Sequence, residues 1–166
     1  MTIQLRSLQA SDLPNLVKYA NNKKIFDNLT DAFPHPFDES KGRAFIERIL
    51  ATKPNHVQAI TIDNELVGCI GVHPKDDVYR KNAELGYWVA ESFWGKGIIS
   101  DAIPKMVQYG FENFEISRIY ATPYAHNVAS QKALEKSGFK LEAHFKNTLF
   151  KNGEYLDEMI YAIRRD

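Results

Sequence analysis

Two stretches of the sequence decide the fold: Asn82-Ala83-Glu84-Leu85-Gly86-Tyr87-Trp88-Val89 and, after four intervening residues, Trp94-Gly95-Lys96-Gly97-Ile98-Ile99-Ser100. The first stretch is apolar and aromatic, which predicts a strand over residues 83–90. After the second stretch, apolar residues recur at intervals of three and four, which predicts an amphipathic helix from 98 to about 114. A glycine turn between strand and helix aims backbone N–H groups and the helix dipole at one point, which suits a phosphate.

The glycines of this turn permit positive φ angles and close approach of a ligand, and Lys96 adds a mobile cation. The spacing differs from the phosphate loop that ends in Gly-Lys-Ser/Thr and from the dinucleotide fingerprint with three glycines, so the sequence supports neither of those sites. The motif by itself leaves two interpretations open: an anion site, or a tight turn into a helix.

The remaining sequence predicts one mixed α/β domain over residues 1–166. We expect strands at residues 3–8, 56–62, 66–72, 83–90, 118–124, 140–150 and 154–163. We expect about four helices, at residues 12–22, 39–51, 98–114 and 127–137. Nothing in the chain resembles a repeat or a linker.

Three local signals refine this prediction. Pro104 inside the third helix frees the carbonyl of Ser100, which predicts a bend or a late helix start. Gly138 suits a left-handed helix cap. Lys151-Asn152-Gly153-Glu154 carries the strongest hairpin signal in the chain.

Composition excludes several classes of partner. Lys plus Arg equals Asp plus Glu at 21 each, so no overall positive field favours nucleic acid. The single cysteine, Cys69, lies in an apolar run typical of a buried strand, and no histidine or cysteine pair has metal-ligand spacing, so we predict no metal. No signal-type or membrane-spanning apolar run is present, which favours a cytoplasmic protein with no membrane partner.

The two opening stretches resemble the core of the GCN-five-related N-acetyltransferase (GNAT) superfamily. The closest resemblance is to the branch that acetylates ribosomal-protein N-termini on alanine or serine. It continues through 127–130, Asn-Val-Ala-Ser, through 135–139, Glu-Lys-Ser-Gly-Phe, and through 152–155, Asn-Gly-Glu-Tyr, before Asp157. This resemblance implies an α/β fold with a single mixed, largely antiparallel sheet of seven strands, and transfer from acetyl-CoA to a primary amine of a protein N-terminus or small molecule by direct attack in a ternary complex.

The resemblance also implies where acetyl-CoA lies. Strands 83–90 and 118–124 would run parallel and splay apart, with the pantetheine arm between them and the pyrophosphate on the amides of residues 95–100. The cofactor-binding residues would be Trp88, Val89, Trp94, Gly95, Lys96, Gly97, Ile98, Ile99, Ser100, Asn127 and Lys132.

Three of these cofactor positions carry a further question. For Lys132, a solvated helix face is an equally good interpretation. Trp94 and Ile99 depart from the family pattern, which often has Gln or Arg and then Gly or Ala at these places, and the β-branched Ile99 needs more room.

For catalysis, the resemblance points to Glu84 as the base that takes the amine proton, either directly or through water, and to Ser130 as a hydrogen-bonding partner of the sulfur. The alternatives are a surface ion pair for Glu84 and a bond from Ser130 to a backbone carbonyl. The tyrosine that protonates the thiolate in much of the superfamily is replaced by Leu134, and the base proposed in the ribosomal branch is replaced by Leu149.

The acceptor side is expected to include the loop from Phe26 to Phe37, with Phe33, His35 and Phe37, together with Tyr124 and the terminal hairpin. Two prolines explain the rigidity of that loop without any ligand. We expect a monomer or a homodimer. The alternative function is a catalytically silent acyl-CoA-binding sensor or scaffold.

Overall fold

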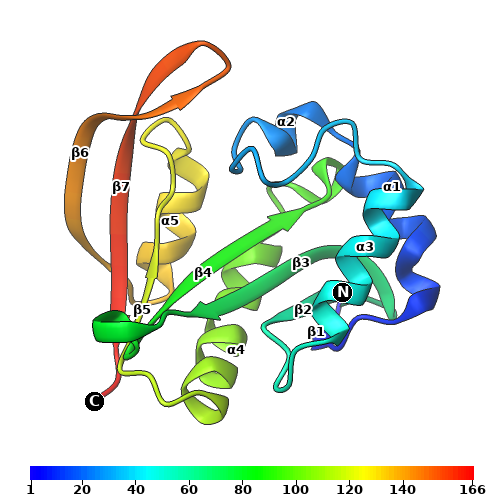
Figure 1. Cartoon of the computed structure of the whole chain (residues 1–166), viewed down its shortest axis with the longest axis horizontal. Helices are drawn as coiled ribbons and strands as arrows, with labels where there is room; N and C mark the ends of the chain where they lie inside the picture. Colours follow the sequence, from blue (N-terminus) through cyan, green and yellow to red (C-terminus); the bar gives the residue numbers. More distant parts are fainter.

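A computed structural model describes all residues, 1–166. One sheet of seven strands runs in the order β1-β2-β3-β4-β5-β7-β6 (Figure 1). Only β4 and β5 are parallel, and every other neighbouring pair is antiparallel. The strands are β1 (Ile3–Arg6), β2 (Val57–Ile62), β3 (Glu65–Pro74), β4 (Asn82–Val89), β5 (Arg118–Ala121), β6 (Lys140–Lys151) and β7 (Glu154–Arg164). The predicted fold, a mixed and largely antiparallel sheet of seven strands, is confirmed.

Five α-helices accompany the sheet, one more than the sequence predicts. They are α1 (Leu13–Ala20), α2 (Lys23–Phe26), α3 (Glu39–Leu50), α4 (Ile98–Asn113) and α5 (Val128–Lys136). The additional helix is α2, whose four residues are too few to show a helical period. It is held instead by a cap, because the Asn22 side chain accepts a hydrogen bond from the Lys24 amide at 2.8 Å.

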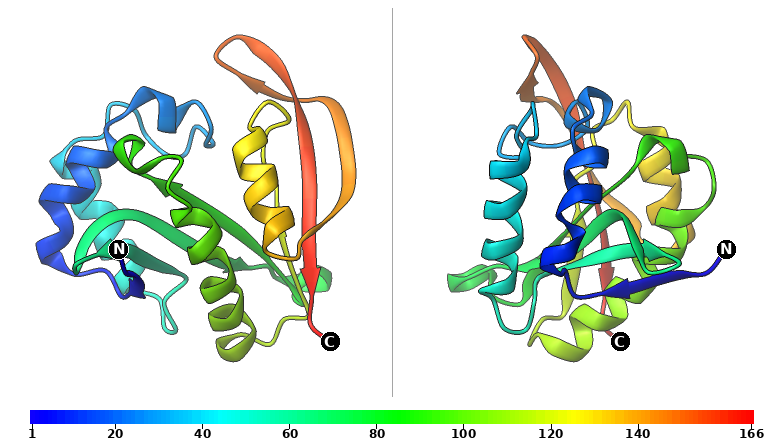
Figure 2. Two further views of the ribbon diagram at one scale, coloured as in Figure 1. Left: turned by 180° about the vertical axis from the view of Figure 1, so that it is seen from behind. Right: turned by 90° about the vertical axis from the view of Figure 1, so that its right-hand side faces the viewer.

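The helices form a layer on each face of the sheet, with α1 and α3 on one side and α4 and α5 on the other (Figure 2). Alternation along β4 separates the two cores. Leu85 and Val89 join the core around α4, whereas Trp88 joins the core beneath α1 and α3. Each fully buried aliphatic side chain of these cores contributes about 1.5–3 kcal/mol of transfer free energy, so both faces of β4 are fixed by packing.

The parallel pair is joined over only part of its length. Residues Asn82 to Glu84 pair with Arg118 to Tyr120, and no later residue of β4 pairs with β5. The closed end is tied by Arg118, whose guanidinium donates to Asn82 Oδ1 at 2.9 Å and to Glu142 Oε1 at 2.8 Å. Beyond this end the strands diverge, as Figure 1 shows, and the predicted splay is confirmed.

Two local predictions need correction. Of the two alternatives for the helix that contains Pro104, a late start is wrong, because the helix begins at Ile98, and a bend stays a prediction. Pro104 is exposed, while Ile98, Ala102 and Ile103 anchor the early turns in the core. Strand β5 ends at Ala121 rather than at Tyr124, because Pro123 has no N–H to donate to a ladder.

The predicted turns are confirmed. Asn152 and Gly153 both have positive φ angles, 53° and 78°, as a two-residue hairpin turn of type I′ requires. Gly138 has a φ of 94° directly after α5, which is the left-handed cap that the sequence indicates.

Candidate active site

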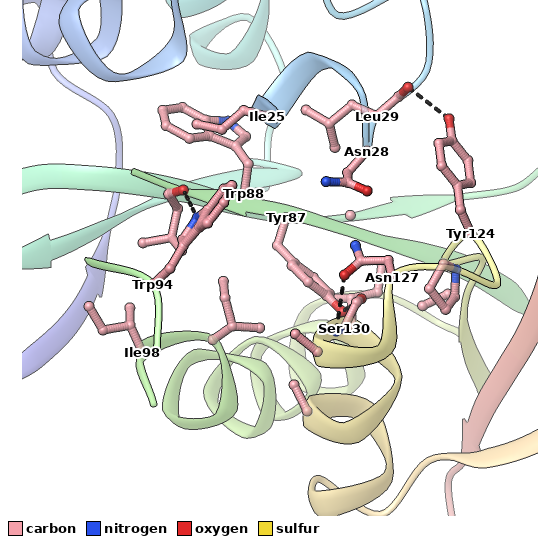
Figure 3. A pocket seen from close by; sticks show the side chains of 18 of the residues that line it. Ile25, Asn28, Leu29, Tyr87, Trp88, Trp94, Ile98, Tyr124, Asn127 and Ser130 are labelled. Carbon is pink, nitrogen blue, oxygen red and sulfur yellow. Dashed lines mark hydrogen bonds between the residues drawn. The ribbon is translucent and has the colours of Figure 1, made fainter. Parts of the chain in front are cut away.

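A cavity of about 510 Å³ occupies the gap between β4 and β5. It is lined on one side of β4 by α2 and the turn after it, and on the other by the start of α4 and by α5 (Figure 3). The cavity therefore passes through the sheet at the splay, so that a ligand from one face can meet a ligand from the other.

The backbone from Gly95 to Ser100, here called the anion turn, leaves six consecutive N–H groups without a protein partner. No residue from 95 to 100 donates a backbone hydrogen bond, and the first donor is Asp101, which bonds to the Gly97 carbonyl at 3.1 Å. Gly95 and Gly97 both have a φ of 75°, and a Cβ built on either would meet nothing within 4 Å. The turn thus presents free donors to open space at a helix N-terminus, which is the geometry that binds a phosphate.

The two departures from the family pattern in this turn have different outcomes. Ile99 is half-buried and packs against the core around α4, so its β-branched side chain has room. The Trp94 indole N–H donates to the Val89 carbonyl at 2.9 Å, with 43% of the residue exposed. The Val89 carbonyl at the open edge of β4 therefore already accepts one hydrogen bond, although its oxygen retains a second lone pair.

Glu84 lines the cavity from β4, with 35% of its side chain exposed. Lys75 Nζ lies 3.3 Å from Oε1, and the Thr122 hydroxyl donates to Oε2 at 3.3 Å. Glu84 therefore both forms an ion pair with Lys75 and lines the cavity, so the two interpretations of this residue do not exclude each other. Its carboxylate is oriented by two donors and still reaches the cavity.

Ser130 lies on the first turn of α5 and also lines the cavity. Asn127 caps this helix, because its side chain accepts a hydrogen bond from the Ser130 amide at 3.3 Å. The Ser130 hydroxyl makes no bond to a backbone carbonyl; its oxygen lies 2.5 Å from the hydroxyl oxygen of Tyr87 on β4. Burial raises the pKa of Tyr87 to about 12.

Tyr87 is a site residue that the sequence reasoning missed. Aromatic residues of a buried strand are expected in the core, and the alternation of β4 puts Tyr87 on the same face as Leu85. The signal that could have found it was its position in the gap between splayed strands, where a core-facing side chain also faces the ligand.

Three of the four residues expected at the acceptor lie outside the cavity lining. Phe37 is 1% exposed in the core beneath α1 and α3, Phe33 stacks on it at 5.3 Å, and His35 is exposed against Phe26. None of the three lines the cavity, because the two prolines turn this loop back onto the core. The residues that line the cavity from this region are Ile25, Asn28, Leu29 and Thr30.

Tyr124 does line the cavity, as the sequence predicts. Its hydroxyl donates to the Leu29 carbonyl at 2.7 Å and so joins the end of β5 to the α2 segment (Figure 3). Trp88 lines the same region, and its Nε1 is the one buried side-chain nitrogen or oxygen without a hydrogen-bond partner. This N–H group has almost no accessible surface, so it is enclosed by protein rather than presented to a ligand.

Of the remaining predicted residues, Lys96 and Lys132 are exposed and lie outside the cavity lining. Leu134 is fully buried in the core, and Leu149 faces Leu156 in the terminal hairpin, so neither supplies a proton. Among the lining residues Glu84 alone carries a charge.

Two kinds of feature are absent from the structure. No group of three or more His, Cys, Asp or Glu residues is arranged to hold a metal ion. None of the helices combines the length and the hydrophobicity that a bilayer span requires.

Residues 2–140 match the family described as "Acetyltransferase (GNAT) domain". The chain belongs to this family. The GNAT assignment confirms the resemblance inferred from residues 82–100 and the motifs that follow them.

Individual GNAT relatives include two curated proteins. The chain is 37% identical over 110 residues to "Putative ribosomal N-acetyltransferase YdaF" of Bacillus subtilis, which covers 66% of this chain and 60% of that protein. It is 33% identical over 100 residues to the ribosomal-protein-serine acetyltransferase of Escherichia coli, covering 60% of this chain and 55% of that protein. These matches span little more than half the length of the two relatives.

Among solved structures, RimL, a ribosomal L7/L12 α-N-protein acetyltransferase in complex with coenzyme A, superposes with a TM-score of 0.86 at 25% identity. The superposition covers 100% of this chain and 96% of that one. The GNAT fold is therefore present over the full length described.

Proposed function

We propose that residues 1–166 form one N-acetyltransferase domain that moves an acetyl group from acetyl-CoA to a primary amine, by direct attack in a ternary complex. The observation that carries this proposal is the anion turn, whose six free N–H groups open into a cavity through the sheet. A phosphate site built from backbone N–H groups beside a strand gap suits coenzyme A, which has a pyrophosphate at one end and an extended amide chain next to it.

The chain's residues fit the parts of this co-substrate. The amides of the anion turn would hold the pyrophosphate. The unpaired edge of β4 at Trp88 and Val89 would hold the pantetheine amides, with Asn127 beside them on α5. Lys96 and Lys132, which are exposed outside the cavity, would meet only the outer phosphate groups.

The bound acetyl-CoA supplies a thioester, and the protein supplies the groups around it. An ammonium ion cannot attack a carbonyl, so the amine must lose a proton, and Glu84 is the only carboxylate that lines the cavity. On the opposite side of β4, Ser130 would donate a hydrogen bond to the sulfur. Glu84 and Ser130 thus serve the two ends of the reaction.

The acceptor side favours an amine without a neighbouring negative charge. Its lining is apolar or neutral apart from Glu84, and no lysine or arginine is present to pair with a carboxylate. Asn28 and Thr30 match the uncharged amides of a peptide backbone. A protein N-terminus or a small amine with neutral substituents is the proposed acceptor, as a relative that acetylates a ribosomal-protein serine suggests.

The rival proposal is a silent acyl-CoA-binding module, which would keep the anion turn and lack turnover. Release of the CoA thiol, measured with a panel of peptides and small amines, separates the two. We expect amine-dependent release above the hydrolytic background. Release that stays at background with every amine, while acetyl-CoA still binds, would favour the silent module. A cytoplasmic location and a monomeric or homodimeric state remain predictions, to be checked by fractionation and by light scattering.

A further inference from the structure

The proposed chemistry uses Ser130 but leaves unused its hydrogen-bonding partner, the Tyr87 hydroxyl. Their oxygens lie 2.5 Å apart, and both residues line the cavity on the α5 side of β4 (Figure 3). The pair joins the central strand to the first turn of α5. It therefore fixes the position of Ser130 relative to the gap in which the thioester would lie.

Two hydroxyls at this distance share one hydrogen, so one donates and the other accepts. A phenol is a far stronger acid than an aliphatic alcohol, so the Tyr87 hydroxyl is the better donor and Ser130 Oγ the better acceptor. Burial raises the pKa of Tyr87 to about 12, which keeps the phenol protonated over the physiological range. The proton of Ser130 is then free to point elsewhere.

We propose that Tyr87 is a positioning residue that donates to Ser130 Oγ and so directs the Ser130 hydroxyl proton into the cavity, toward the leaving sulfur. This inference rests on the proposed acetyl transfer. As the new carbon–nitrogen bond forms, the carbon–sulfur bond breaks and its electron pair goes to the sulfur. Glu84, which is partly exposed to solvent, passes the ammonium proton to water before the attack and takes the second amine proton as the new bond forms. Tyr87 and Ser130 both keep their own protons and only orient hydrogen bonds.

This arrangement explains how the site can work with Leu134 at the position of the usual acid. Leu134 is fully buried in the core and has no proton to give. A thiolate needs stabilisation rather than full protonation to leave, and an oriented hydroxyl supplies it. A hydrogen bond to a charged group is worth enough that its loss slows a step by about tenfold to a hundredfold.

The test compares Tyr87→Phe, Ser130→Ala and the double variant, with Tyr161→Phe as the matched control. Tyr161 also has a buried ring and a hydroxyl that donates to α5, to Glu135 Oε1 at 2.8 Å, but it does not line the cavity. We expect Tyr87→Phe and Ser130→Ala to lower kcat by a similar factor, with calorimetric affinity for CoA unchanged. The double variant should lose no more than Ser130→Ala alone, because Tyr87 acts through Ser130.

A second readout does not depend on turnover. Ultraviolet titration of the thiolate in bound CoA should give a thiol pKa below that of free CoA in the wild type, and a value nearer to free CoA in both site variants. Tyr161→Phe should behave as the wild type in both assays.

Three results would overturn the inference: a Tyr87→Phe variant with unchanged kcat and thiol pKa, an equal loss from Tyr87→Phe in the Ser130→Ala background, or an equal loss in Tyr161→Phe. A wild type that binds CoA without lowering its thiol pKa would also overturn it, and would leave the proposed function standing. A wild type that does not bind CoA would remove both.

Discussion

At the scale of single residues, the site divides into groups that act through the backbone and groups that act through side chains. The anion turn uses N–H groups, which is why Trp94 and Ile99 can replace the usual residues without removing a donor. Glu84 and Ser130 act through side chains, and each is held by partners, Lys75 and Thr122 for the first and Tyr87 for the second. Substitutions in the two groups should therefore have separable effects.

Gly97→Val tests the backbone group. Gly97 has a φ of 75°, where a β-branched residue is strained by about 1–2 kcal/mol, and its relief would rotate the amides of the turn. We expect calorimetric affinity for acetyl-CoA to fall at least about tenfold, or about 1.4 kcal/mol. Gly138→Val, which introduces similar strain at a φ of 94° outside the cavity, is the control and should bind normally. Unaltered affinity in Gly97→Val would remove the turn from the site.

Glu84→Gln tests the side-chain group. The variant keeps the size of the residue and removes the base, so the rate should fall by about 10²-fold or more while affinity for acetyl-CoA changes little. The loss should be greatest below the pKa of the acceptor amine, where most of the amine is protonated. A pH profile of kcat/KM checks this, and a rate equal to that of the wild type at every pH would disprove the assignment.

At the scale of elements, the closed end of the splay sets the width of the gap. Glu142 on β6 accepts from Arg118 on β5 and from Arg164 on β7, at 2.8 and 2.9 Å. Hydrogen bonding to Arg118 holds the pKa of Glu142 below its usual range, against a smaller opposing effect of burial. These bonds join three strands at the end where β4 and β5 are still paired.

Glu142→Gln should therefore lower the free energy of unfolding at neutral pH by about 1 kcal/mol or less, since the group is close to solvent. Because the folded-state pKa is lowered, this contribution is present above the ordinary glutamate pKa of about 4.3 and is lost as pH falls through the lower folded value. Urea unfolding should thus show a larger difference between variant and wild type at pH 7 than near pH 3. An equal difference at both values would contradict the ion-pair account.

The strands and helices also show how much of the fold and of the site the sequence could predict. Strand β4, the anion turn and α4 were predictable because alternation, two glycines and a helical period follow one another without ambiguity. Helix α2 was not, since four residues show no period and its cap depends on one side chain, Asn22. The acceptor residues were misplaced for a related reason: Phe33 and Phe37 have the character of a recognition loop, and only the tertiary path of that loop shows that they pack into the core.

At the scale of the whole molecule, three segments far apart in sequence surround the acceptor side of the cavity. They are the turn after α2, the loop after β5 and the tip of the β6–β7 hairpin. The turn after α2 is joined to the loop after β5 by the bond from Tyr124 to Leu29, and to the hairpin tip by Lys151, which lies 2.8 Å from Asp31. Among the residues that line the cavity, Glu84 alone carries a charge. The lining therefore has no basic residue that could pair with a negative charge on the acceptor.

This predicts selectivity between acceptors of equal size. An amino acid amide or a short peptide should react with a kcat/KM at least about tenfold above that of the same free amino acid, because an unpaired carboxylate near Glu84 costs more than about 1.4 kcal/mol. Steady-state rates with matched amide and acid pairs check the prediction. A preference for the free acid would mean that a cation outside the cavity lining reaches the acceptor.

The central claim is that the anion turn holds acetyl-CoA for transfer to an amine. Its most direct test is mass spectrometry of a cell extract after addition of the protein and isotopically labelled acetyl-CoA. The account predicts labelled acetyl groups on amines with the wild type, and none above background with Gly97→Val. Bound but unconsumed acetyl-CoA, with no labelled amine anywhere in the extract, would contradict it.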